Sequence, residues 1–351
     1  MIRGVIRNIF KITLVVLIIA LFWFLQKYYN LIFPNINEKN LEEQAAKYYN
    51  GSEILITKLG GGKDEVGYRI GGELRDEYAC SRGFVIDSYG NIFVLDNVNG
   101  RILKFNQQGS LVQTFTNGVS KNKEFYPPYP KIIKGDSDTI YFTDKGDTVK
   151  RIEENGNIST IWQVENATQI KSIWFDQKKN LYIFLKNGEV VLIDKKGEEQ
   201  KYNLLLPDEN YYVLQNVVDK NGNIYQLMSE KDKGNHEIRA VDLSGKVLKN
   251  IVCTTFDLSK NRAGFVINSP FGEYLYLSLY LRADPPEEKY SLAIVKLDLE
   301  CNVINTLRLP IVYPWGTIYI TKDEEVYLSR SLILEDGKWG QWIIEKYKFS
   351  E

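Results

Sequence analysis

The chain has 351 residues, with 44 Lys and Arg against 45 Asp and Glu, and a formal net charge of -1 at pH 7. Acidic and basic residues are interspersed, which argues against a nucleic-acid-binding protein, because phosphate contacts require clustered Lys and Arg. Three cysteines, Cys80, Cys253 and Cys301, allow at most one internal disulfide. A small disulfide-stapled scaffold is therefore excluded, and a large apolar core must stabilise the fold.

The N-terminal part contains an uninterrupted apolar run, LVVLIIALFWFL, at residues 14–25. Flanking lysines extend this run toward the roughly 20 residues that span a bilayer. We therefore expect a cytoplasmic segment at 1–11 and a single transmembrane signal anchor at 12–26, since more basic residues precede the run than follow it closely. A cleaved signal peptide is the alternative, although no small-x-small cleavage site follows. In both cases the rest of the chain is exported, and the uncleaved anchor holds the extracytoplasmic part at the cell membrane.

Residues 27–50 are expected to form a juxtamembrane linker with a short amphipathic helix in NEKNLEEQAAKYY. After Gly51 the pattern changes to alternating apolar and polar residues, interrupted by Gly, Asn and Asp every 8 to 12 residues. This pattern is typical of an all-β domain.

The β region is a repeat. Each copy has an aromatic residue in a short apolar run such as NIFVLD, and successive aromatics lie 48, 41, 43, 51 and 51 residues apart. That spacing is the length of one four-stranded propeller blade. The six aromatic positions are Phe93, Tyr141, Tyr182, Tyr225, Tyr276 and Tyr327.

Five copies contain four expected strands, and the sixth ends one strand short at WIIEKYKFSE. A turn precedes the fourth strand, with glycine expected at positive φ at Gly109, Gly156, Gly197 and Gly245. Residues 51–59 form an additional strand at the start of the region, which can supply the missing one. We therefore predict an all-β, six-bladed β-propeller over 51–351, closed by an N-terminal outer strand.

Residues 80–118 resemble an NHL repeat through Asp96, Asn97, Asn99, Arg101 and Ile102. The whole of 51–351 resembles the six-bladed propellers of the TolB-like superfamily, of which NHL proteins are one branch. The resemblance implies the fold. In place of Asp96 and Asp144, the later copies have Leu185, Met228, Leu279 and Arg330.

Long insertions between the second and third strands are expected to share one face with the connections between blades. They lie at residues 229–237, 282–290 and 331–341. Long loops on a rigid scaffold often bind partners. The aromatic candidates for a partner-binding face are Phe125, Tyr126, Tyr129 and Trp339. Alternatively, FYPPYP is a stiff connector packed on the propeller edge.

Alignment of the innermost strands places four cations near the same mouth of the central channel: Arg82, Lys131, Lys171 and Arg262. Like charges in a confined mouth repel unless an anion offsets them, so an anionic ligand is a hypothesis for this position. In the alternative, these side chains point outward or pair with Asp87, Asp176 and Glu124.

Catalytic and metal-binding residues are not expected. His236 is the only histidine, which excludes a three-histidine zinc site, and a Ser-His-Asp triad would have to use it. We therefore expect no cofactor, no metal and no enzyme activity, but a membrane-anchored extracytoplasmic propeller that binds or scaffolds a partner protein or cell-envelope polymer. The alternative is a hydrolase or lyase acting on sugar-acid or envelope substrates through carboxylates of the long loops, Asp284, Glu287, Glu288 and Glu335.

Overall fold

The computed structural model describes most of one compact unit, Gly51–Glu351; a second unit, Met1–Asn50, lies outside the described residues. The described ranges are 52–58, 62–66, 68–70, 78–80, 83–121, 131–135, 138–153, 155–165, 168–204, 210–219, 221–230, 236–251, 262–265, 274–282, 290–300, 302–309, 317–333 and 339–349. Within these ranges, no helix is long and apolar enough to cross a membrane. The predicted segments at 1–11, 12–26 and 27–50 lie outside them.

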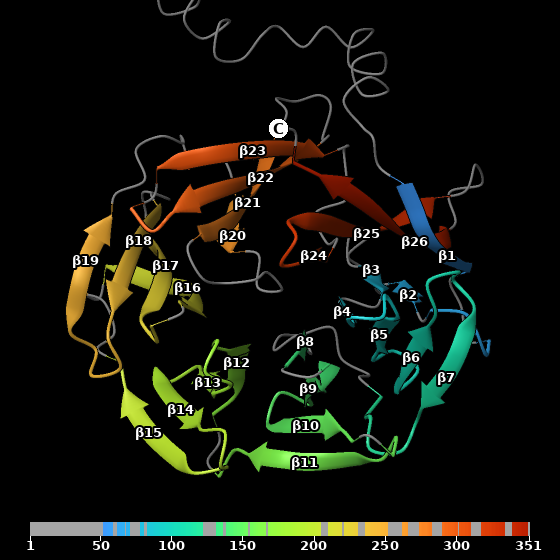
Figure 1. The fold of residues 1–351 in the computed structure, drawn as a ribbon, viewed down its shortest axis with the longest axis horizontal. Helices are drawn as coiled ribbons and strands as arrows, with labels where there is room; N and C mark the ends of the chain where they lie inside the picture. The colour runs from blue at the N-terminus through green and yellow to red at the C-terminus, as the bar shows by residue number, and fades with distance from the viewer. Residues whose placement is uncertain are drawn as a thin grey trace, which may run out of the picture. The chain divides into compact units, whose positions relative to one another are not determined.

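Six four-stranded antiparallel sheets are arranged around a central channel as the blades of a propeller (Figure 1). Blade 1 consists of β4 (Phe84–Ile86), β5 (Ile92–Asp96), β6 (Arg101–Phe105) and β7 (Leu111–Phe115). Blade 2 consists of β8 (Ile132–Lys134), β9 (Ile140–Asp144), β10 (Thr148–Ile152) and β11 (Ile158–Gln163). Blade 3 consists of β12 (Ile170–Phe175), β13 (Leu181–Leu185), β14 (Glu189–Ile193) and β15 (Glu199–Asn203). Blades 4 and 5 consist of β16 (Tyr211–Val218), β17 (Ile224–Glu230), β18 (His236–Val241) and β19 (Val247–Ile251); and β20 (Arg262–Phe265), β21 (Tyr274–Arg282), β22 (Tyr290–Asp298) and β23 (Val303–Leu309).

Blade 6 is assembled from both ends of the β region. Its inner strands are β24 (Ile318–Ile320), β25 (Glu325–Ile333) and β26 (Trp339–Lys348), and its outer strand is β1 (Ser52–Lys58). β1 pairs antiparallel with β26, with Ser52 opposite Lys346 and Lys58 opposite Gln341. The predicted closure by an N-terminal strand is therefore confirmed. A separate two-stranded sheet contains β2 (Tyr68–Ile70) and β3 (Tyr78–Cys80).

The repeated sequence signals have a clear structural role. All six predicted aromatic positions lie on the second strand of a blade. The turns before the fourth strands contain Gly109, Gly156, Gly197 and Gly245 at φ of 74°, 84°, 84° and 80°, as predicted. Only glycine adopts this conformation without a steric cost, so these turns fix where each outer strand begins.

The core lies between blades, where apolar faces of neighbouring sheets pack together. One buried cluster joins blade 3 to blades 4 and 5 and includes Trp174 and Phe184 from blade 3. Another joins blade 2 to the opposite face of blade 3 and includes Ile170 and Leu185. The two faces of blade 3 can therefore be told apart by the cluster to which each residue belongs.

The residues that resemble an NHL repeat stabilise blade 1. Asp96 is fully buried and accepts hydrogen bonds from Asn99 Nδ2 (2.9 Å) and Arg101 Nε (2.8 Å). The second guanidinium branch of Arg101 donates to the carbonyls of Gly62 (2.7 Å) and Glu65 (2.6 Å). These residues attach the segment after β1 to blade 1, which is a structural role.

Candidate functional site

The two ends of the channel differ in the loops that they carry. Each blade's first and second strands, and its third and fourth strands, are joined at one end, here called the short-turn end. The second-to-third loops and the connections between blades lie at the other, the long-loop end. A well-defined cavity of about 790 Å³ lies at the short-turn end.

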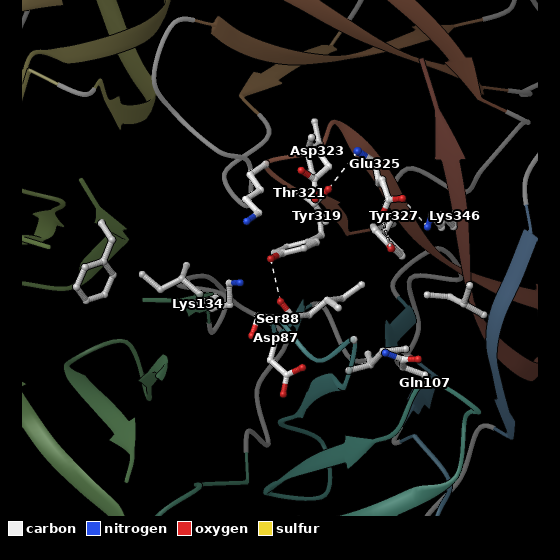
Figure 2. A pocket seen from close by; sticks show the side chains of 18 of the residues that line it. Asp87, Ser88, Gln107, Lys134, Tyr319, Thr321, Asp323, Glu325, Tyr327 and Lys346 are labelled. Atoms are coloured by element: carbon white, nitrogen blue, oxygen red, sulfur yellow. Dashed lines mark hydrogen bonds and ion pairs between the residues drawn. The ribbon is translucent and has the colours of Figure 1, made fainter. Parts of the chain in front are cut away.

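The cavity extends from the channel outward between blades 6 and 1 (Figure 2). Lys134 projects from blade 2 on the channel side, and Glu325, Tyr327 and Lys346 of blade 6 lie together on the outer side. Apolar side chains from blades 1, 2 and 3, Ile86, Ile133 and Phe175 among them, complete the lining. The hollow is thus elongated, and both polar and apolar side chains line it.

Two tyrosines form the wall from blade 6. The hydroxyl of Tyr319 donates to the carbonyl of Ile86 at 3.0 Å and so joins blade 6 to blade 1. The hydroxyl of Tyr327 donates to Glu325 at 2.9 Å. Burial raises the pKa of both phenols well above the ordinary value, so both remain protonated donors at neutral pH.

The carboxylate of Glu325 is surrounded by donors. Besides the hydrogen bond from Tyr327, it forms ion pairs with the ammonium groups of Lys346 (2.6 Å) and Lys348 (3.5 Å). Burial opposes its ionisation, but the hydrogen bonds from Lys346 and Tyr327 outweigh burial and lower its pKa. Glu325 is therefore an ionised structural partner and not a proton donor at neutral pH.

Blades 1 and 2 are joined beside the cavity by Asp138. It accepts the backbone N–H of Ser88 at 2.8 Å, the hydroxyl of Ser88, and the ammonium of Lys134 at 3.3 Å. Burial raises the pKa of Asp138, but the bonds from Ser88 and Lys134 outweigh that effect, and the pKa lies below its usual value.

Asp87 also lines the cavity, and its carboxylate is bonded within its own turn. It is 7% exposed and accepts the backbone N–H of Tyr89 (3.0 Å), the backbone N–H of Asn91 (2.7 Å) and the Asn91 side-chain amide (2.7 Å). Asp176 and Asp219 bond in the same way to Asn180 and Asn223 in blades 3 and 4. The aspartate at this position in the repeat therefore stabilises a turn, and Asp87 is not suited to act as a catalytic acid.

The carboxylates of Glu325, Asp138 and Asp87 are therefore all engaged in structural hydrogen bonds or ion pairs. Lys322 and Asp323 are the lining charges for which no partner is present in the described part of the chain. The described residues also contain no group of three or more His, Cys, Asp or Glu side chains that could hold a metal ion. The arrangement is suited to holding a ligand by hydrogen bonds and apolar contact.

At the long-loop end, the structure describes two of the four predicted channel cations, Lys131 and Lys171. Arg82 lies outside the described residues, and Arg262 is described only as backbone at the start of β20. The predicted partner-binding residues Phe125, Tyr126 and Tyr129 are also outside, and Trp339 is described only as backbone at the start of β26. The loop carboxylates Asp284, Glu287, Glu288 and Glu335 lie outside as well.

Lys171, one of the two predicted channel cations that the structure describes, is half-buried. Its ammonium donates to the carbonyl of Val213 in blade 4. Burial lowers its pKa to about 8. The alternative in which Lys171 pairs with Asp87 or Asp176 is not found, because both carboxylates bond within turns at the short-turn end.

The sequence did not indicate the cavity. Its walls come from Tyr319 in blade 6 and Ile86 in blade 1, far apart in the chain, and its polar residues belong to ordinary turn sequences. The ring closure was the available signal, because it predicted that blades 6 and 1 are neighbours.

Comparisons with known proteins give similarity of fold. No family model and no curated protein matches the chain. A streptogramin B lyase structure is similar at 11% identity and a TM-score of 0.49, covering 81% of this chain and 97% of the other. Virginiamycin B lyase from Staphylococcus aureus is similar at 12% identity and 0.46, covering 86% and 90%. Regucalcin, a calcium-binding protein from Agrobacterium tumefaciens, is similar at 11% and 0.44, covering 76% and 90%.

Proposed function

We propose that this chain is a non-catalytic binding propeller, anchored in a cell membrane by residues 12–26, with residues 51–351 on the extracytoplasmic side. The ligand is a cell-envelope polymer or an exposed segment of a partner protein. The observation that carries the proposal is the elongated cavity of about 790 Å³ between blades 6 and 1.

The engagement of three carboxylates at or beside the cavity supports binding over catalysis. A general acid must give up a proton and a general base must accept one. Glu325, Asp138 and Asp87 each accept several hydrogen bonds that hold blades or turns together. Using one of them in proton transfer would disrupt the local structure.

The shape of the cavity supports an extended ligand. It runs from the channel toward the rim and is lined by blades 1, 2, 3 and 6 (Figure 2). A polymer chain can enter such a hollow from the side and leave its ends in solvent. Its hydroxyl or amide groups would find the spare donors and acceptors of Lys134, Lys322 and Asp323.

Binding is tested by titrating residues 51–351 with oligosaccharide fragments of envelope polymers and with extended peptides in a calorimeter. The Lys322→Ala, Asp323→Ala double variant should weaken binding about tenfold through the loss of two polar contacts. Lys195→Ala, an exposed lysine of blade 3, is the matched control. Equal affinity in wild type and double variant would reject the cavity as the site.

The alternative function, a hydrolase or lyase, is tested in the same samples. Mass spectrometry of the ligand after long incubation shows whether a bond has been cleaved. Cleavage that disappears in Glu287→Gln or Glu335→Gln variants would favour the enzyme and contradict the proposal.

Membrane anchoring is tested separately by fractionation of cells that express the full chain. We expect residues 51–351 to remain in the membrane pellet after alkaline extraction and to be digested by protease added outside the membrane. Release as a soluble, shortened chain would instead indicate a cleaved signal peptide.

A further inference from the structure

Lys171, which is half-buried, and Ser172, which is buried, are consecutive residues of β12 whose polar side chains have unmet hydrogen-bonding capacity. In the described part of the chain, the Lys171 ammonium has one partner, the carbonyl of Val213, and no carboxylate. Ser172 is 4% exposed, and its hydroxyl has no hydrogen-bond partner among the described residues. A buried cation without a counter-charge and a buried hydroxyl without a partner are both unfavourable.

A β-bulge brings these two side chains to one face of blade 3. Ile170 pairs with Leu185 and Ser172 pairs with Phe184, so Lys171 is an additional residue with no partner on β13. Phe184 belongs to the core shared with blade 4, whereas Leu185 and Ile170 belong to the core shared with blade 2. Ser172 therefore faces blade 4, and Lys171 reaches blade 4 through Val213.

Blade 4 has a matching irregularity at the same level. Val213 pairs with Met228 and Gln215 pairs with Leu227, so Leu214 is an additional residue of β16. The side chains of Tyr212 and Leu214 are 59% and 37% exposed, so the corner where β16 meets β12 is open to solvent. Bulges next to functional sites redirect side chains, and here two of them coincide where the two inner strands meet.

We propose that this corner between blades 3 and 4 binds a small anionic group, a carboxylate or a phosphate, through the Lys171 ammonium and the Ser172 hydroxyl. The anion supplies the counter-charge that the described residues do not provide, and its second oxygen accepts a hydrogen bond from the Ser172 hydroxyl. The corner is at the long-loop end and is independent of the cavity proposed above.

The proposal is tested on the full-length chain in detergent, with sodium phosphate and sodium acetate compared with chloride at equal pH and ionic strength. We measure thermal unfolding, and also trace acetylation of amines followed by mass spectrometry. At ten times the dissociation constant, we expect the anion to raise Tm by about 3 °C and to slow acetylation of Lys171 about tenfold. A response to acetate alone identifies a carboxylate ligand, and a response to phosphate alone identifies a phosphate ligand.

Three variants make the result specific. Lys171→Met should abolish the Tm response, and Ser172→Ala should weaken anion affinity about tenfold while Lys171 remains. Lys201→Met removes a lysine on β15 of the same blade that already pairs with Glu165 and Glu199 and should leave the response intact. Unprotected Lys171 in both anions, or an anion response that persists in Lys171→Met, would overturn the proposal. Failure of the polymer titrations would not affect this outcome, because they probe the other end of the channel.

Discussion

Lys150 of blade 2 and Lys171 of blade 3 are both largely buried lysines, but their environments differ. Lys150 has a side chain that is 16% exposed, and its ammonium contacts Asp144 and the carbonyl of Gly118 (2.6 Å). Lys171 contacts only a carbonyl among the described residues, and burial lowers its pKa to about 8. The difference shows that burial alone does not define the role of a lysine. A buried counter-charge makes Lys150 a structural tie, and its absence makes Lys171 a candidate for ligand binding.

The largest effect is expected when Lys150 is made to resemble Lys171. Asp144→Ala removes the counter-charge and two hydrogen bonds to Ser120, and should lower the free energy of unfolding by about 3 kcal/mol. Urea unfolding measures the change. The double variant Asp144→Ala, Lys150→Met should recover part of the lost free energy of unfolding, because it also removes the buried Lys150 ammonium that no longer has a counter-charge. If the double variant is no more stable than the single one, Lys150 is not held by Asp144.

For Lys171, a substitution that removes the charge is expected to stabilise the protein. At pH 7 and without added anion, Lys171→Met should be about 1–2 kcal/mol more stable than wild type, because a buried charge is removed. The pKa of Lys171 is about 8 in the folded state, below its value in the unfolded state. At pH values between these two pKa values, the unfolded state binds more protons than the folded state, so the stability of the wild type rises with pH. The difference between the two proteins should therefore shrink as pH increases above 8. A stability difference between wild type and Lys171→Met that stays constant up to pH 10 would contradict a lowered pKa for Lys171 in the folded state.

A smaller effect is expected at the short-turn end, where charges are paired across blades. Asp138→Asn retains a residue that tolerates the φ of 59° found there but weakens the bonds from Ser88 and Lys134, and should cost about 1 kcal/mol at pH 7. Because the folded pKa of Asp138 is depressed, its contribution is present at neutral pH and lost as pH falls below the unfolded value. The variant and wild type should thus converge in acid, as measured by thermal unfolding from pH 7 to 3.

The smallest effect is expected for Ser172→Ala. The substitution removes a buried hydroxyl that has no partner, so stability without anion should rise by about 0.5 kcal/mol. Ser159→Ala serves as the contrast, since the Ser159 hydroxyl donates to Glu153 and its loss should not stabilise. A clear destabilisation in Ser172→Ala would mean that the hydroxyl is already satisfied.

The sequence predicted the fold well because blade construction is local. Each blade shows its aromatic second-strand residue and its turn glycine, such as Tyr182 and Gly197 in blade 3, within some 40 residues. Closure by residues 51–59 followed from counting strands, since the sixth copy lacked one. These signals depend on alternation and turn chemistry, which single sequences carry.

The sites were less accessible to sequence reasoning. The alignment placed Lys171 near the channel mouth, in the same blade position that Leu214 occupies in blade 4, but counting residues from the aromatic positions assumes unbroken strand pairing. It could not reveal that both are additional residues in bulges, and bulges decide which face of a blade a side chain joins. The cavity depends on how Tyr319 approaches Ile86 across the ring closure, a contact with no local sequence signal.

The pairing of β1 with β26 also constrains the order of folding. Ser52 cannot form its strand pair until Lys346, one of the last residues of the ring, has been synthesised. Until then β1 is a strand without a partner, and blade 6 cannot form, while blades 1 to 5 can form in order as they emerge. A truncated or stalled chain would therefore expose the unpaired edges of both strands, which quality-control proteases and chaperones recognise. Completion of the ring therefore requires that the last strand of blade 6 has been synthesised.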